Sequence, residues 1–102
     1  PDAVQRQVFF FGCEWALHGV RVNAIAPGVF MTPLTRPLFE KDPVRRERIE
    51  ARTPMARTGE CHELVGAAIF LASDASRFVT GQVIKVEGGF LAAGLVPPRK
   101  QG

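Results

Sequence analysis

The residues best placed to do chemistry lie in the stretch VRVNAIAPGVFMT at residues 20–32. Its first seven residues predict a short strand that ends before Pro27-Gly28. Open α/β sheets bind ligands just beyond the carboxyl ends of their strands, and Gly28 would let backbone approach such a ligand without a Cβ in the way. Taken alone, Pro27-Gly28 is more typical of an ordinary turn, and Thr32-Pro33 is typical of a helix N-cap followed by a first-turn proline. Spacing alone therefore does not decide between a ligand site and a structural turn.

Two other groups of residues carry weaker signals. Cys13, His18, Cys61 and His62 lack the paired short spacings of zinc sites, so no metal centre is expected and both cysteines are predicted to be buried and reduced.

An arginine-rich stretch could hold an anionic substrate or a phosphate. Its members alternate with Glu47 and Glu50 at helical spacing, which favours a solvated helix face instead. The arginines in question are Arg45, Arg46, Arg48, Arg52 and Arg57.

The positions of apolar residues and of Gly and Pro indicate the elements that must hold these residues. They predict helices at residues 4–17, 33–40, 43–52 and 60–72, and strands at residues 20–26 and 82–86. A strand, a long crossover containing a helix and a second strand form a right-handed parallel unit. Two parallel strands alone are marginally stable, so the sequence predicts part of a wider α/β sheet.

The predicted helix at residues 4–17 is apolar nearly all round, with Phe9, Phe10, Phe11 and Trp15 among its residues. A chain of 102 residues has little material to cover such a helix. We expect it to meet either the missing part of a domain or another subunit.

Composition excludes several classes of function. The formal net charge of +3 is explained by a solvated surface, and nucleic-acid recognition motifs are missing, so no nucleic-acid partner is expected. No segment is apolar enough for a membrane span or a signal peptide, which predicts a cytoplasmic protein without a membrane partner. The chain starts with Pro1, so it either follows a processing event or begins inside a longer chain.

At several positions in register the sequence resembles the short-chain dehydrogenase/reductase family. In that family a strand ending in V-N-x-I-x-P-G-x-x-x-T is followed by a mobile substrate lid, R-x-G, a helix, and a final strand ending in V-D-G-G. The matching stretches here are residues 22–32, 57–59, 63–74 and 79–89. The resemblance runs from about Glu14 to Gly89.

The resemblance implies a fold and the residue ranges that its parts occupy in this chain. Residues 1–90 would be the C-terminal portion of a Rossmann-like doubly wound parallel sheet, comprising its last two strands, helices and substrate lid. The lid would cover about residues 33–58, and residues 91–102 would form a mobile C-terminal tail. Asn23 would be a structural residue of the strand.

The resemblance also implies how a nicotinamide cofactor, NAD or NADP, would be held. Backbone amides near Val29 and Phe30 would contact the nicotinamide carboxamide. Thr32 would contact the carboxamide or the pyrophosphate, and Pro27 and Gly28 would form the floor beneath the ring. The residues that distinguish NAD from NADP fall outside this stretch.

The implied activity is hydride transfer between NAD(P) and a small-molecule carbonyl or alcohol, in a homo-oligomer (dimer or tetramer). Residues 27–42 look most like members that act on sugar acids such as gluconate or deoxygluconate. Reduction of 3-oxoacyl groups on acyl carrier protein is the alternative substrate class.

Several departures from the family bear on activity. The family uses a Tyr, a Lys four residues later and a Ser, yet this sequence contains no Tyr, and the Lys would fall at or before Pro1. The glycine-rich dinucleotide fingerprint is also absent, so the chain alone is expected to be inactive. A noncatalytic remnant or oligomerisation module is therefore the rival interpretation. Cys61 in place of a Pro and Glu87 in place of an Asp are smaller departures.

Overall fold

The computed structural model describes residues 2–95, which pack as two units that each combine two separate segments of the chain. Unit 1 contains the residues up to 26 together with residues 64–85, and unit 2 contains residues 27–63 together with the residues from 86 onward. Of the tail predicted at residues 91–102, residues 92–95 form a 3-10 helix, η4 (Ala92–Leu95), and residues 96–102 lie outside the described part.

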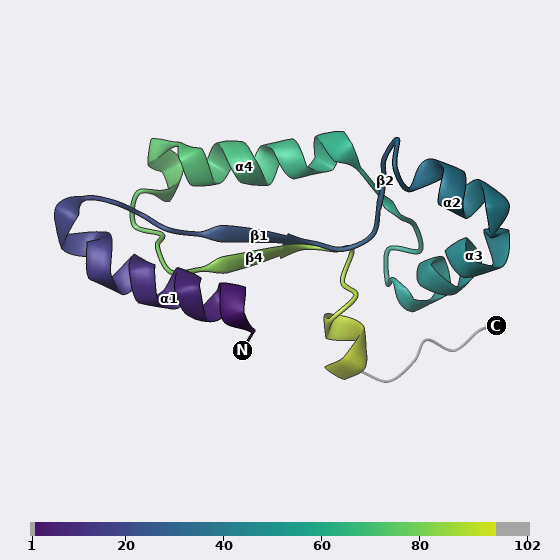
Figure 1. Cartoon of the computed structure of the whole chain (residues 1–102), viewed down its shortest axis with the longest axis horizontal. Coiled ribbons are helices and arrows are strands. Elements are labelled where there is room, and N and C mark those ends of the chain that lie inside the picture. Colours follow the sequence, from purple (N-terminus) through teal and green to yellow (C-terminus); the bar gives the residue numbers. More distant parts are fainter. Residues whose placement is uncertain (1, 96–102) are drawn as a thin grey trace. The chain divides into compact units, whose positions relative to one another are not determined.

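In unit 1 a pair of strands lies between two helices, with α4 on one side and α1 on the other (Figure 1). Its elements are α1 (Ala3–Trp15), η1 (Ala16–His18), β1 (Ala24–Pro27), α4 (Val65–Ala72), η3 (Asp74–Ser76) and β4 (Val83–Val86). Asp2 caps the N-terminus of helix α1, and its carboxylate accepts a hydrogen bond from the Gln5 amide at 2.7 Å. The helical stretch ends at Gly19, which adopts the left-handed conformation (φ 76°) expected of a helix C-terminal glycine.

Strands β1 and β4 are parallel neighbours, as the crossover pattern predicted. The Ala24 amide donates to the Gln82 carbonyl and the Gly28 amide donates to the Val86 carbonyl, both at 2.9 Å, so the two strands advance in the same direction. Strand β1 starts later than predicted because the residues just before it bond to the neighbouring segment partly through side chains and not through a regular backbone ladder. Chief among them is Asn23, whose amide group donates to the Val79 carbonyl and accepts from the Gln82 amide.

Arg21 joins the end of helix α4 to the segment that follows it. Its guanidinium donates to the Leu71 carbonyl at 2.9 Å, to the Ser76 hydroxyl at 3.0 Å and to the Val79 carbonyl at 3.3 Å. The bond to Leu71 satisfies a carbonyl group that the helix end leaves unpaired. Ser76 is completely buried beneath this contact.

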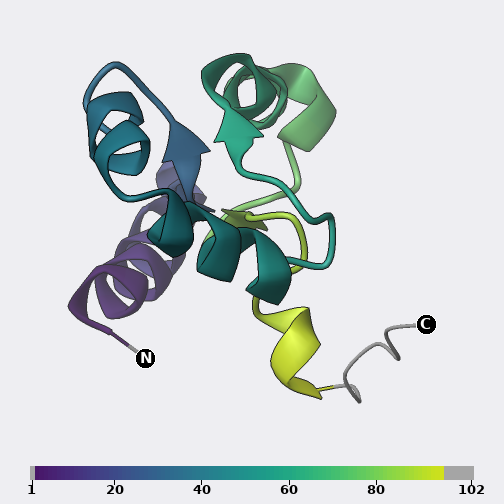
Figure 2. The same cartoon turned by 90° about the vertical axis from the view of Figure 1, so that its right-hand side faces the viewer.

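Unit 2 contains a second parallel pair, which the sequence analysis did not predict. Its elements are β2 (Phe30–Met31), α2 (Arg36–Lys41), α3 (Pro43–Arg52), β3 (Gly59–Glu60) and η2 (Cys61–Leu64). Phe30 pairs with Gly59 and Met31 with Glu60, and the two strands lie side by side in Figure 2. Among the described residues of this unit, Phe30, Met31 and Phe39 are the buried apolar ones.

The helices of unit 2 follow the predicted positions with one shift. Helix α3 starts at Pro43 as expected, and the Asp42 carboxylate caps it by accepting from the Arg45 amide at 3.1 Å. Helix α2 begins at Arg36 and not at Pro33, because residues 33–35 form a turn.

Burial differs from the prediction at the cysteines. Cys13 and Cys61 are both exposed and form no disulfide, so the prediction that they are buried is wrong. Cys13 lies on α1, where Phe9, Phe10 and Trp15 are also exposed, because the described chain does not enclose this helix. Within residues 2–95, no helix has the length and apolar content needed to cross a membrane.

Candidate functional site

The site is a pocket of about 480 Å³ that lies entirely within unit 2. Three segments line it: the chain from the end of β1 into β2, the chain from the end of α3 into η2, and the turn that leaves β4. Loops at the carboxyl ends of neighbouring parallel strands are where open α/β sheets bind ligands. The lining residues are Pro27, Gly28, Val29, Phe30, Thr53, Met55, Arg57, Gly59, Glu63, Val86, Glu87, Gly88 and Phe90.

Four of the five predicted cofactor residues, Pro27, Gly28, Val29 and Phe30, line this pocket, and the fifth, Thr32, does not. The Thr32 hydroxyl accepts a hydrogen bond from the Thr35 amide at 3.0 Å, but this bond closes the turn at residues 33–35. The N-cap of α2 is Thr35, so the prediction that Thr32 caps a helix starting at Pro33 is wrong. The Thr35 hydroxyl in turn donates to the Phe30 carbonyl at 2.8 Å. Thr32 therefore organises the turn that follows β2.

Gly28 has a structural reason to be glycine. A Cβ at this position would lie 2.8 Å from the Cβ of Glu87 and 2.9 Å from its Cα, closer than packed atoms allow. The Glu87 carboxylate also accepts from the Leu91 amide at 2.9 Å, so it holds the turn on the other side of the pocket. Gly28 therefore lets the chain pack closely against Glu87, which is a structural reason for glycine here that does not depend on a ligand.

The backbone of Val29 and Phe30 is fixed from the side of β3. The Gly59 amide donates to the Val29 carbonyl at 2.9 Å, and the ring of Phe30 lies against the Cα of Gly59. Cys61 adds a weak bond from its thiol to the Met31 carbonyl at 3.6 Å. Strand β3 is therefore the support of the predicted cofactor-binding segment.

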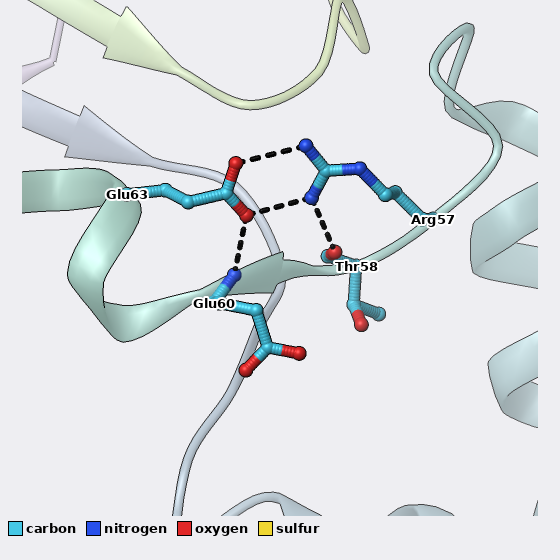
Figure 3. Close-up of polar contacts among 4 residues, drawn as sticks. All are labelled: Arg57, Thr58, Glu60 and Glu63. Atoms are coloured by element: carbon cyan, nitrogen blue, oxygen red, sulfur yellow. Dashed lines mark hydrogen bonds and ion pairs between the residues drawn. The ribbon is translucent and has the colours of Figure 1, made fainter.

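Arg57 and Glu63 form a bidentate ion pair on the wall of the pocket (Figure 3). The two guanidinium nitrogens donate to the two carboxylate oxygens at 2.6 and 2.8 Å. Glu63 also accepts from the Glu60 amide at 3.0 Å, and Arg57 also donates to the Thr58 carbonyl at 3.2 Å. Sequence reasoning missed this pair, since it placed Arg57 with the arginines of the preceding helix.

This arrangement favours the ionised carboxylate. The hydrogen bonds from Arg57, and then the bond from the Glu60 amide, lower the pKa of Glu63 from 4.5 to about 2. The same pair raises the pKa of Arg57. Among residues 2–95, Arg57 is the one cationic side chain that lines the pocket, and it is already paired with a carboxylate of this chain.

The other predicted polar groups lie outside the pocket. Arg46 pairs with Glu50 at 2.9 Å on the exposed surface of α3, in agreement with a solvated helix face. Among residues 2–95 there is no group of three or more His, Cys, Asp or Glu side chains that could hold a metal ion.

Known proteins are similar to this chain in sequence and in fold. A family model described as enoyl-(acyl carrier protein) reductase matches residues 3–91. The 5-keto-D-gluconate 5-reductase of Escherichia coli (strain K12) is 49% identical over 80 residues, covering 78% of this chain and 31% of that protein. The gluconate 5-dehydrogenase of Gluconobacter oxydans (strain 621H) is 47% identical over 76 residues, covering 74% of this chain and 29% of that protein.

A solved structure agrees with these sequence matches. The gluconate 5-dehydrogenase from Burkholderia cenocepacia J2315, in complex with NADP and tartrate, superposes with a TM-score of 0.81 at 43% identity. The match covers 88% of this chain and 35% of that chain.

The chain belongs to the short-chain dehydrogenase/reductase family. It spans about 30% of the length of the curated relatives it matches. Its α/β architecture is the C-terminal portion of a Rossmann-like doubly wound parallel sheet, so the predicted family and fold class are both confirmed.

Proposed function

We propose that this chain forms the nicotinamide and substrate end of an NAD(P)-dependent oxidoreductase that interconverts a carbonyl and an alcohol on a sugar acid or a similar small polar substrate. The observation that carries the proposal is the pocket at the carboxyl ends of β1 and β4, in a chain of this family. Its volume of about 480 Å³ falls within the usual size of small-molecule sites. The relatives named for gluconate and ketogluconate support the substrate class.

Each residue has a role in this proposal. The backbone amides of Val29 and Phe30 hold the nicotinamide carboxamide, and Pro27 and Gly28 support the ring from below. Thr32 contacts the carboxamide or the pyrophosphate while it caps the following turn. NAD(P), when bound, supplies or accepts the hydride, and the residues of this chain orient it. Orientation of this kind is worth several kcal/mol of the barrier, because it removes the entropy cost of bringing reactants together.

The Tyr that transfers the proton in this family would have to lie outside these 102 residues, because they contain no Tyr. The family donates or accepts the substrate proton through a Tyr assisted by a Lys. General acid-base help of this kind contributes about a hundredfold to ten-thousandfold to a rate. We therefore propose that the chain is inactive by itself and active only with the remaining part of such a fold.

A second candidate function is a noncatalytic oligomerisation module. The observation that favours it is the exposure of Phe9, Phe10 and Trp15 on α1. Exposed apolar patches on soluble proteins often mark interaction sites. In that case the chain would associate with a complete homologue and would contribute nothing to cofactor binding.

A grafting experiment separates the two candidates. The aligned 80-residue segment of the E. coli 5-keto-D-gluconate 5-reductase is replaced by the corresponding segment of this chain, so that the host supplies the Tyr, the Lys and the glycine-rich turn. We expect the grafted enzyme to bind NADP(H) or NAD(H) and to reduce 5-ketogluconate, with the unaltered host as control. A folded graft that binds neither cofactor would show that the proposed function is wrong. Activity on 3-oxoacyl thioesters in place of sugar acids would select the alternative substrate class.

A further inference from the structure

Glu63 collects three hydrogen bonds that converge from the segment just before it. Two come from the guanidinium of Arg57 and one from the backbone amide of Glu60 (Figure 3). The bond from Glu60 is the capping bond that a glutamate makes to the residue three positions earlier at a helix start. The carboxylate therefore closes a bracket around residues 57–60.

Strand β3 lies inside this bracket. Strand β3 consists of Gly59 and Glu60. The residues just before it, 53–58, belong to no helix or strand that could hold it in place. A two-residue strand contributes few ladder hydrogen bonds, so its position depends on the contacts at its ends. The side chain of Glu60 itself points away from the ion pair in Figure 3, which leaves its backbone amide as the group that is held.

The bracketed strand in turn contacts the segment assigned to the cofactor. The Gly59 amide donates to the Val29 carbonyl at 2.9 Å, and the ring of Phe30 rests on Gly59. A displacement of β3 would therefore be transmitted directly to the backbone of Val29 and Phe30.

We propose that Arg57 and Glu63 are positioning residues for the cofactor site: their bracket fixes β3, and β3 fixes the backbone amides of Val29 and Phe30. The inference rests on the proposed function, which assigns those amides to the nicotinamide carboxamide. It also assigns Arg57 a role different from binding a substrate carboxylate. Both terminal nitrogens of its guanidinium are already paired with Glu63.

The chain contains a matched control for this pair. Arg46 and Glu50 form an ion pair on α3 with side-chain exposures of 48% and 32%, against 47% and 32% for Arg57 and Glu63. Both are Arg–Glu ion pairs with the same access to water. They differ in geometry, since Arg46 makes one bond through Nε and Arg57 makes two. They also differ in what they hold, because Arg46 and Glu50 lie four residues apart within one helix.

The first measurement is amide hydrogen exchange in the full chain. Glu63→Gln and Arg57→Met should each speed the exchange of the Gly59 amide by about fivefold, because an exposed ion pair contributes modestly and opening here is local. Glu50→Gln should leave that amide within about twofold of the parent. Arg57→Lys keeps the charge but not the bidentate geometry, so its exchange rate should fall between those of the parent and Arg57→Met. Unchanged exchange at Gly59 in both Glu63→Gln and Arg57→Met would overturn the bracket.

The second measurement uses the grafted enzyme. At a saturating concentration of the sugar-acid substrate, Glu63→Gln should raise the KM for the cofactor severalfold above that of Glu50→Gln, while the KM for the sugar acid stays close to that of Glu50→Gln. A cofactor KM equal to that of Glu50→Gln, with faster Gly59 exchange, would overturn the positioning role. A parent graft that binds no cofactor would instead overturn the proposed function, and the exchange measurement would then decide on the bracket by itself.

Discussion

Gly59 lies directly against the ring of Phe30, so closely that a Cβ on Gly59 would overlap ring atoms, with Cδ1 at 2.6 Å and Cζ at 2.9 Å. Gly59→Ala should therefore force Phe30 out of its place and destabilise unit 2 by about 1–3 kcal/mol, as overpacking does. Gly66 in α4 is the matched control, because a Cβ there meets nothing within 4 Å. Gly66→Ala should stabilise the chain by up to about 1 kcal/mol, since alanine is the better helix former. Urea unfolding measures both, and equal effects of the two substitutions would contradict this packing.

The Arg57–Glu63 pair should make stability depend on pH in the acid range. The folded pKa of Glu63 is depressed to about 2 from 4.5, so its contribution is fully present above pH 4.5 and is lost as the pH falls toward 2. The thermal midpoint of the parent should exceed that of Glu63→Gln at neutral pH, and the two should converge toward pH 2. Because the pair is exposed, added salt should reduce the difference at neutral pH. A difference that grows on acidification would contradict the assignment.

Thr32 can be tested for its two roles separately. Thr32→Ala removes the hydroxyl that accepts from the Thr35 amide and should cost about 1 kcal/mol of stability. Thr32→Ser retains a hydroxyl and should keep both the cap and the cofactor affinity. In the grafted enzyme, Thr32→Ala should weaken cofactor binding by more than its loss of stability explains. If both variants bind cofactor like the parent, Thr32 is a cap alone.

The chain alone should show no dehydrogenase activity. Without a Tyr it has no family-type proton donor, and without the glycine-rich turn it lacks the helix N-terminus at which the family holds the pyrophosphate. The purified chain is assayed with NAD(H) and NADP(H) against sugar acids, ketones and 3-oxoacyl thioesters. Turnover above the blank with any of them would refute the expectation.

Helix α1 should mediate association. Phe10 is 58% exposed there, and burial of a large apolar side chain stabilises by about 1.5–3 kcal/mol, so self-association is expected to cover it. Light scattering should find dimers or larger species, and Phe10→Ser should weaken them. Val44→Ser on α3 is the control, because Val44 is exposed to nearly the same extent, 55%. A folded monomer at all concentrations would contradict the interface.

Long periodic elements of the fold were predictable from sequence, and short ones were not. Helix α3 was predicted because Asp42-Pro43 marks its start and the arginine and glutamate spacing marks its faces. Strands β2 and β3 have two residues each, too few for any period to appear. The first strand was predicted too early, since nothing in the spacing shows that Asn23 bonds through its side chain.

Only one wall of the candidate site, the wall that follows β1, could be predicted from the sequence. Pro27, Gly28, Val29 and Phe30 follow a recognisable strand, so their place at its carboxyl end could be inferred. The opposite wall, with Arg57 and Glu63, could not. Their separation of six residues is not a helical spacing, and an ion pair across a turn leaves no periodic signal.

The interleaving of the two units has a consequence for synthesis on the ribosome. Helix α1 and strand β1 belong to unit 1, but their partners lie in residues 64–85, and Arg21 finds Leu71, Ser76 and Val79 only after those residues have emerged. At translation rates of roughly 5–20 residues per second, the interval of about 60 residues lasts about 3–12 s. During that time the face of α1 that becomes buried in the folded unit, at Val8 and Gly12, is outside the ribosome without its partners. It adds to the aromatic side chains that stay exposed, and apolar surface of this kind is what chaperones bind on a nascent chain.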